Sequence, residues 1–159
     1  MEYKYYSDAK TQRRNYLFGY YNRPYLWFQR RFTGPLLIAL SAAEFYLASE
    51  TNGFVLALFF GIFGIFYTLR PFIALKRIKF ESGGGIVSVA EDTISISDES
   101  GNFTIKAQEL LKIIPKKNYV FLKVRLRTVL YFLVDLNSLE NADAFLKEIK
   151  SRYPDKFIG

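Results

Sequence analysis

The chain has 159 residues and a formal net charge of +7, and half of its residues are hydrophobic. That length leaves room for a membrane-inserted segment and one small domain, and excludes two multi-layer domains. Cysteine and histidine are both absent, which excludes disulfides, thiolate nucleophiles, histidine acid–base chemistry and zinc sites built on these residues.

Residues 1–33 are predicted to be a cytoplasmic segment that lies at the membrane surface. They combine seven tyrosines and Trp27 with seven Lys or Arg residues and two acids. Tyrosine and tryptophan favour the headgroup region, and arginine is attracted to anionic lipid. The same mixture can stack on single-stranded nucleic acid, but next to a membrane segment we favour the lipid surface and expect no nucleic-acid partner.

Residues 34–79 are predicted to form a transmembrane helical hairpin. A helix needs about 20 mostly apolar residues to cross a bilayer, and residues 54–75 supply them. The preceding apolar run, residues 36–49, must extend back toward Trp27, and the polar residues 50–52 form the tip between the helices. Pro71 is expected to kink or end the second helix. Cations at the membrane interface are expected from Arg30, Arg31, Arg70, Lys76, Arg77 and Lys79.

The excess positive charge is concentrated beside this hairpin. Residues 70–79 hold four Lys/Arg and no acid, whereas residues 80–159 hold eleven basic and eleven acidic residues. The apolar residues between, 34–69, contain only Glu44 and Glu50 as charged groups. Because Lys and Arg are enriched in cytoplasmic flanks, the chain is predicted to lie in the bacterial cytoplasmic (inner) membrane with both termini in the cytoplasm.

Two features of the hairpin have a structural and a functional interpretation. Small residues pack transmembrane helices closely, either within one hairpin or between copies of the chain, and here they are Gly53, Ala57, Gly61 and Gly64, with Ala39 and Ala43 as a matching pair. Glu44 is a candidate intramembrane residue, predicted to lie roughly 12 Å from the tip. It is either functional or satisfied by Ser41, Tyr46 or water.

Residues 80–159 are predicted to form a small α+β domain that folds on its own, after a glycine linker at residues 82–85. Alternating or apolar runs predict strands at 86–89, 93–97, 103–105, 119–126 and 128–136, with a turn at 98–102, while residues 109–114 are ambiguous. Apolar residues then recur at helical spacing from Leu139 to Tyr153. Asn137, with Glu140 three positions later, predicts a capping box at the start of this helix.

Basic residues are clustered in sequence across neighbouring elements of this domain. Lys106 and Lys112 precede five further cations, which form the candidate surface for a partner or for anionic lipid: Lys116, Lys117, Lys123, Arg125 and Arg127. Solvent faces of sheets are ordinarily charged, so a solvated face without a ligand is the alternative interpretation.

The order of hairpin, glycine linker, strands and a final helix with the sequence LENADAFLKEIKSRYP resembles the YcxB-like family of small bacterial membrane proteins. The resemblance covers about residues 30–153 and rests on hydrophobic patterns. It implies a C-terminal domain similar to a pleckstrin-homology fold, a half barrel closed by a C-terminal helix. It implies no enzyme activity and no defined ligand.

No catalytic or cofactor motif accompanies these features. The sequence has no Walker loop and no Gly-x-Gly-x-x-Gly, and it lacks the histidine of a Ser-His-Asp set. We therefore expect a non-catalytic membrane-anchored module with three parts, residues 1–33, 34–79 and 80–159, whose last part meets a protein partner, a second copy of the chain or the membrane surface. The alternative is an oligomeric small channel or transporter component that uses Glu44.

Overall fold

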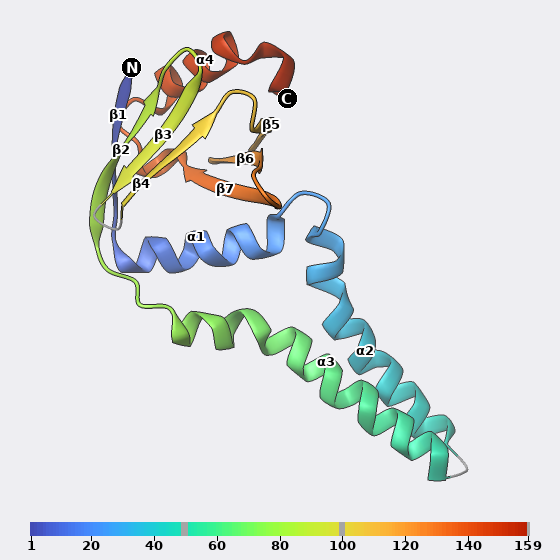
Figure 1. Cartoon of the computed structure of the whole chain (residues 1–159). Coiled ribbons are helices and arrows are strands. Elements are labelled where there is room, and N and C mark those ends of the chain that lie inside the picture. The colour runs from blue at the N-terminus through green and yellow to red at the C-terminus, as the bar shows by residue number, and fades with distance from the viewer. Residues whose placement is uncertain (49–50, 99–100, 159) are drawn as a thin grey trace. The chain divides into compact units, whose positions relative to one another are not determined.

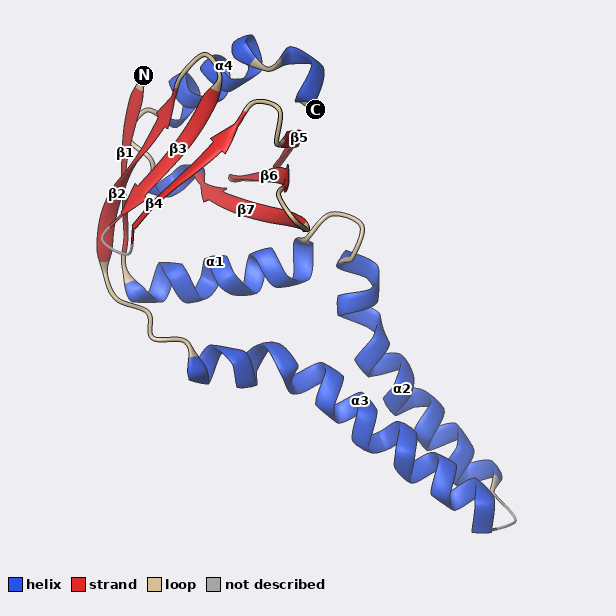
Figure 2. Cartoon of the chain, viewed as in Figure 1, coloured by secondary structure: helices blue, strands red, loops and turns tan. Residues whose placement is uncertain are grey.

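A computed structural model describes residues 1–48, 51–98 and 101–158 of the chain (Figure 1). The chain divides into two compact units, one made of Met1–Asn15 with Phe80–Gly159 and the other of Tyr16–Lys79. We call them the sheet unit and the helical unit, because the strands lie in the first and the two long helices in the second (Figure 2). The predicted tip residue Glu50 and the turn residues Glu99 and Ser100 lie outside the described residues.

The first strand, β1 (Glu2–Ser7), corrects the predicted division into residues 1–33, 34–79 and 80–159. It pairs antiparallel with β2 (Gly83–Val89), so that Glu2 lies opposite Ser88 and Ser7 opposite Gly83. Tyr3 does not form part of a surface segment, since it is buried and its ring meets Phe145 edge-on at 5.4 Å, whereas Tyr6 is exposed. The helical unit is therefore an insertion between the first two strands of one sheet.

The predicted glycine linker is also wrong, because Gly83–Val89 is continuous strand. A β-carbon on Gly85 would come within 2.7 Å of the Tyr5 ring, and one on Gly84 within 3.0 Å of the Tyr5 carbonyl oxygen. Glycine in a strand marks a close approach of another group. Here the missing side chains make room for β1.

Two antiparallel sheets make up the described strands of an α+β fold. The first has the order β1-β2-β3-β4 and includes β3 (Thr93–Asp98) and β4 (Gly101–Lys106). The second has the order β5-β6-β7, from β5 (Leu110–Lys116), β6 (Tyr119–Arg125) and β7 (Val129–Asp135). The predicted strands are confirmed, and the ambiguous residues 109–114 prove to be mostly strand.

The core of the sheet unit lies between these sheets and helix α4 (Ala142–Arg152). The alternation in β6 is confirmed for Val120, Leu122 and Val124, which are fully buried in the core. It fails at its two other apolar positions, because Phe121 on the opposite face is also buried and Leu126 is exposed. On α4, Phe145 and Ile149 are fully buried, as the helical spacing predicts. One face of an amphipathic helix thus closes the unit.

The predicted capping box at the start of this helix is wrong. Asp135, at the end of β7, accepts a hydrogen bond from the Asn137 backbone N–H at 3.0 Å and begins the short 3₁₀ helix Leu136–Ser138. The α-helix starts later, after Asn141, which has a left-handed backbone with φ of 59°. Asx side chains compete for local backbone donors. Asp135 accepts from the Asn137 N–H, the donor that the Glu140 side chain would have accepted from in the predicted capping box.

Helix α1 (Ala9–Asn22) starts in the sheet unit and continues into the helical unit. The Asp8 carboxylate accepts from the Thr11 N–H at 2.7 Å and caps its first turn. At the base of the helix, Arg14 lies 3.6 Å from the buried Asp135 carboxylate, and the Tyr119 hydroxyl donates to Asn15 at 3.0 Å. These contacts fasten the beginning of α1 to the second sheet.

The helical unit contains α2 (Trp27–Leu47) and α3 (Thr51–Arg77). Pro71 lies inside α3 without ending it, which excludes one of the two expected effects, an end of the helix at this residue. Among the described residues, α3 alone is long and apolar enough to cross a membrane. Helix α2 falls short because its 21 residues include Arg30, Arg31 and Glu44.

Candidate functional site

The α2–α3 interface is built from small residues. A β-carbon on Gly64 would come within 2.7 Å of the Ile38 Cγ1 atom and 3.1 Å of the Gly34 carbonyl oxygen, and one on Gly61 within 2.9 Å of the Ser41 hydroxyl. Ala57 is buried. Backbones that approach this closely leave room for hydrogen only. The prediction that the glycines of α3 pack the hairpin on itself is therefore confirmed.

The matching residues on α2 differ from those predicted. Ala39 and Ala43 are exposed, whereas Gly34, Ile38 and Ser41 meet the glycines of α3. The Ser41 hydroxyl donates to the Ala57 carbonyl oxygen at 2.7 Å. An interhelical hydrogen bond of this kind adds to packing in a lipid environment.

The remaining faces of the hairpin expose large apolar side chains. On α3 only 11% of the most apolar stretch is buried, which distinguishes this helix from the core helix of a globular domain. Exposed apolar residues lie all along it, including Phe54, Leu58, Ile62, Ile65, Phe66 and Leu69. An exposed apolar surface of this extent marks a site of contact with a membrane or with another protein.

The six predicted interface cations fall into two groups. Arg30 donates to the Tyr20 carbonyl oxygen at 2.9 Å and lies over the Tyr20 ring at 4.5 Å, while Arg31 donates to Asn22 Oδ1 at 2.7 Å. These two fasten the end of α1 to the start of α2. The others have exposed side chains: Arg70, Lys76, Arg77 and Lys79.

Glu44 lies in the last turn of α2, three residues before Leu47, and is half-buried. Three residues correspond to about 5 Å of helix rise. The predicted distance of roughly 12 Å runs to the tip at residues 50–52 and stays a prediction, because Glu50 lies outside the described residues. The Glu44 carbonyl oxygen accepts from the Ala48 N–H at 2.8 Å, and the Ser41 hydroxyl donates to Ala57, so Ser41 is not the partner of the Glu44 carboxylate.

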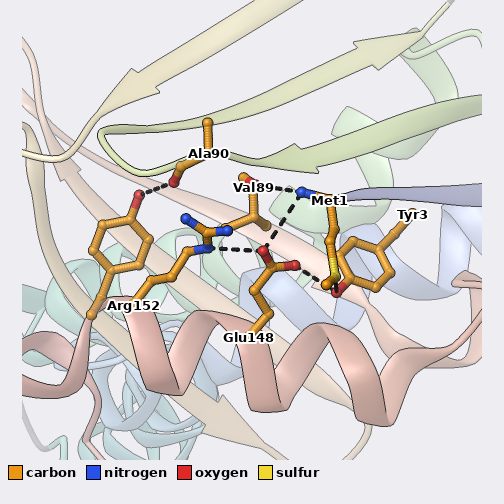
Figure 3. A network of polar contacts seen from close by, with 7 residues as sticks. Met1, Tyr3, Val89, Ala90, Glu148 and Arg152 are labelled. Carbon is orange, nitrogen blue, oxygen red and sulfur yellow. Dashed lines mark hydrogen bonds and ion pairs between the residues drawn. The ribbon is translucent and has the colours of Figure 1, made fainter.

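In the sheet unit, a polar network that the sequence did not reveal joins β1 to α4 (Figure 3). The Tyr3 hydroxyl donates to Glu148 Oε2 at 2.6 Å, and Arg152 Nε donates to Glu148 Oε1 at 2.8 Å. The N-terminal ammonium donates to the Val89 carbonyl oxygen at 2.8 Å and lies 3.6 Å from Glu148. The available signals were the two-residue alternation of β1 and the four-residue spacing of Glu148 and Arg152.

This network perturbs the ionisation of its members. Burial, followed by the hydrogen bond and the negative charge of Glu148, raises the pKa of Tyr3 to about 12. For Glu148, burial acts to raise the pKa, but the hydrogen bonds from Tyr3 and Arg152 outweigh it and hold the pKa below its ordinary value. A neutral tyrosine and an ionised carboxylate are the stable pair, so the network holds β1 against α4.

The five predicted surface cations do not form one patch. Lys116 ends β5 and Lys117 lies in the following turn with a left-handed φ of 56°, whereas Arg125 ends β6 and Arg127 lies in the next turn. The seven residues of β6 separate these turns by roughly 20 Å. Lys123 lies nearer the second group, with its ammonium over the Tyr131 ring at 5.8 Å. The prediction of a single surface is wrong because consecutive turns of a meander lie at opposite sheet ends.

No family model, curated protein or solved structure matches this chain. The resemblance to the YcxB-like family therefore stays a prediction. Within the part of the chain that the structure describes, no group of three or more Asp, Glu, His or Cys side chains is placed to hold a metal ion. Two features of the molecule bear on function, the exposed apolar hairpin and the charged surface of the sheet unit.

Proposed function

We propose that this protein is a non-catalytic, membrane-anchored binding or regulatory module of the bacterial cytoplasmic membrane. In this proposal α2 and α3 cross the bilayer as a hairpin, and both termini and the sheet unit lie in the cytoplasm. The sheet unit then meets a protein partner or the membrane surface. The observation that carries the proposal is a pair of helices packed together through glycines that expose large apolar side chains on their other faces.

The lengths and charges of the two helices support a crossing by both. Helix α3 has 27 residues, or about 40 Å of rise, which exceeds the roughly 30 Å of hydrocarbon. Helix α2 has its charged residues near its two ends, at Arg30, Arg31 and Glu44, and none between residues 32 and 43. Charged side chains near the ends of a helix can snorkel to the interface.

The topology of the sheet unit supports a pleckstrin-homology-like half barrel. The unit has four strands in one sheet, three in the next and a closing helix. The closing helix agrees with the half barrel that the YcxB-like resemblance implies, whereas β1 lies outside the residues that the resemblance covers. The insertion of the helical unit between β1 and β2 ties both of its ends to the same sheet. In such a module, the chain joins the sheet unit to the membrane-inserted helices twice, once at each end of the helical unit.

The alternative, an oligomeric channel or transporter component that uses Glu44, is less well supported. Its assembly was predicted to run through Ala57, Gly61 and Gly64, and these residues are in contact with α2 of the same chain or buried. Its carboxylate lies in the last turn of α2. A membrane anchor agrees both with the packing of these small residues inside one hairpin and with a carboxylate near a helix end, and it requires no pore.

Single cysteines test the anchor and its orientation, because the chain has no cysteine of its own. Thr51→Cys and Ser151→Cys are exposed positions at the start of α3 and on α4. We expect a membrane-impermeant maleimide to label Thr51→Cys in intact cells and Ser151→Cys only after the cells are opened. The reverse pattern contradicts the proposed orientation, and release of the protein from membranes by alkaline carbonate contradicts the anchor.

A further inference from the structure

The second sheet carries a charge imbalance that the neutral total of residues 80–159 conceals. Residues 110–134, which include β5, β6 and most of β7, hold six Lys/Arg and no Asp/Glu. The rest of residues 80–159 holds five Lys/Arg and eleven Asp/Glu. Glu109, just before β5, lies next to Arg125, and its carboxylate accepts from the Lys106 backbone N–H at 3.0 Å. A surface with such an excess of cations attracts anions.

One end of this sheet also carries the exposed apolar side chains. Near the C-terminus Ile158 is 44% exposed, and its N–H donates to the Ile113 carbonyl oxygen. Within the second sheet and its turns, residues 110–135, the exposed large hydrophobics are Leu126, Val129 and Leu130, at 38%, 38% and 39% exposure. All three lie at the β6–β7 turn, residues 125–130, which we call the β6–β7 tip. At the other end of β6, around Lys117, no large apolar side chain is exposed.

The tip has cations on both sides of its apolar residues. Arg125 lies opposite Val129 in the sheet, and the Leu126 N–H donates to the Thr128 carbonyl oxygen to close the turn. Lys112, Lys123 and Tyr131 lie side by side in the next row, because Lys112 pairs with Lys123 and Lys123 with Tyr131. The Arg125 and Arg127 side chains are exposed and that of Lys112 is half-buried, while the Arg125 backbone N–H donates to the Glu109 carbonyl oxygen at 2.8 Å.

From this arrangement we infer that the β6–β7 tip, with Lys112 and Lys123, binds the surface of a bilayer that contains anionic phospholipid. Arginine binds phosphate oxygens through two parallel N–H bonds, and Leu126 and Val129 enter the headgroup boundary between the arginines. Shallow apolar insertion and attraction to anionic lipid act together in surface-bound segments. Tyr131, beneath Lys123, has the amphipathic ring that favours the same depth.

The inference rests on the proposed membrane anchor, which also explains why a small contact suffices. Each Lys or Arg near an anionic surface strengthens binding by roughly fivefold, which is weak for a free domain. A tether raises the effective concentration of the second contact to the millimolar range. An acidic protein partner matches the cations as well. An anionic bilayer matches both the cations and the apolar residues, and the proposed anchor keeps the sheet unit close to it.

Fluorescence at the tip tests the inference with the full chain. Thr128→Cys places a single thiol in the turn, and Asn118→Cys places a matched thiol in the exposed turn at the other end of β6. Both are labelled with an environment-sensitive dye and reconstituted in nanodiscs of phosphatidylcholine alone or mixed with phosphatidylglycerol. Headgroup spin-labelled lipid serves as the quencher.

We expect blue-shifted, lipid-quenched emission from position 128 in the mixed nanodiscs, loss of both effects in phosphatidylcholine alone or in high salt, and no response at position 118. Equal quenching at the two positions, or at position 128 in both lipids, overturns the inference. If the chain does not enter nanodiscs at all, the proposed anchor itself fails, and floatation shows this before any dye is read.

Two double variants separate the charged and apolar contributions. Arg125→Gln with Arg127→Gln is expected to lower the bound-to-free ratio of the tip by roughly 25-fold, from fivefold for each cation, and Leu126→Ser with Val129→Ser to abolish the blue shift. Lys117→Gln, at the far turn, is the control and should change neither. Unchanged quenching in the arginine variant, with an unchanged melting curve, refutes the role of the tip.

Discussion

Removal of β1 should unfold the sheet unit, although residues 80–159 were expected to fold alone. We compare two soluble chains, residues 80–159 by themselves and residues 1–15 joined to 80–159 by a short Gly/Ser linker. The linker can be short because the Gln12 side chain donates to the Glu81 carbonyl oxygen at 2.6 Å and Arg13 lies over the Phe80 ring. The two ends therefore meet in the folded unit.

The expected loss in the free energy of unfolding follows from the contacts that β1 makes in the sheet unit. Tyr3 is 5% exposed and packs on Phe145, and truncation of a buried aromatic side chain costs about 3–5 kcal/mol. Loss of its hydroxyl leaves Glu148 short of one donor, at about 1–3 kcal/mol. Small domains have total stabilities of only about 5–15 kcal/mol, so loss of the whole strand leaves residues 80–159 marginal or unfolded.

Urea denaturation followed by circular dichroism is the assay. We expect a cooperative transition for the linked chain and none for residues 80–159 alone. Within the linked chain, Tyr3→Ala should lower the free energy of unfolding by about 3–5 kcal/mol, whereas Tyr6→Ala, at an exposed position of the same strand, should leave it nearly unchanged. A cooperative transition with the same midpoint in both chains would refute the assigned role of β1.

Four further outcomes are expected from the contacts described above. Because the pKa of Tyr3 is raised to about 12 from an ordinary 10.0, its stabilising contribution is complete below pH 10 and is lost as the pH rises through 12; Tyr3→Phe should flatten this alkaline decline in thermal melts. The pKa of Glu148 is lowered, so its contribution is present above its ordinary value of 4.5 and is lost as the pH falls through the folded value, a loss that Glu148→Gln should remove. Gly64→Ala should cost the hairpin about 1–3 kcal/mol through overpacking against α2, measured as detergent thermostability, whereas Ala43→Gly on the exposed face serves as the control. Glu44→Gln should leave unchanged the set of proteins that co-purify with the tagged chain from native membranes; Glu44-dependent ion flux in liposomes would instead favour the channel alternative.

The local patterns predicted most elements because those elements follow their own periodicity. The two-residue alternation of β6 and the three- and four-residue spacing along α4 each describe one face that must be buried, and the core uses those faces. The apolar length of α3 and the small residues Gly61 and Gly64 likewise depend on a single helix and its neighbour in the chain. Such features can be predicted from the sequence because the residues that form one buried face recur at a fixed spacing within a short stretch of the chain.

The sequence patterns predicted α2, α3, α4, most strands and most of the buried faces, but neither α1 nor β1. Only the tertiary structure decided that β1 belongs to the sheet, since its partner β2 begins 76 residues after Ser7 and no local pattern measures that pairing. Tyrosines beside cations suit a membrane surface and an edge strand equally well, and three glycines suit a linker as well as a strand on which Tyr5 lies. The cations around Lys117 and Arg127 were likewise separated by the meander and not by their spacing. Long-range pairing assigns these residues because it selects between local states of similar free energy.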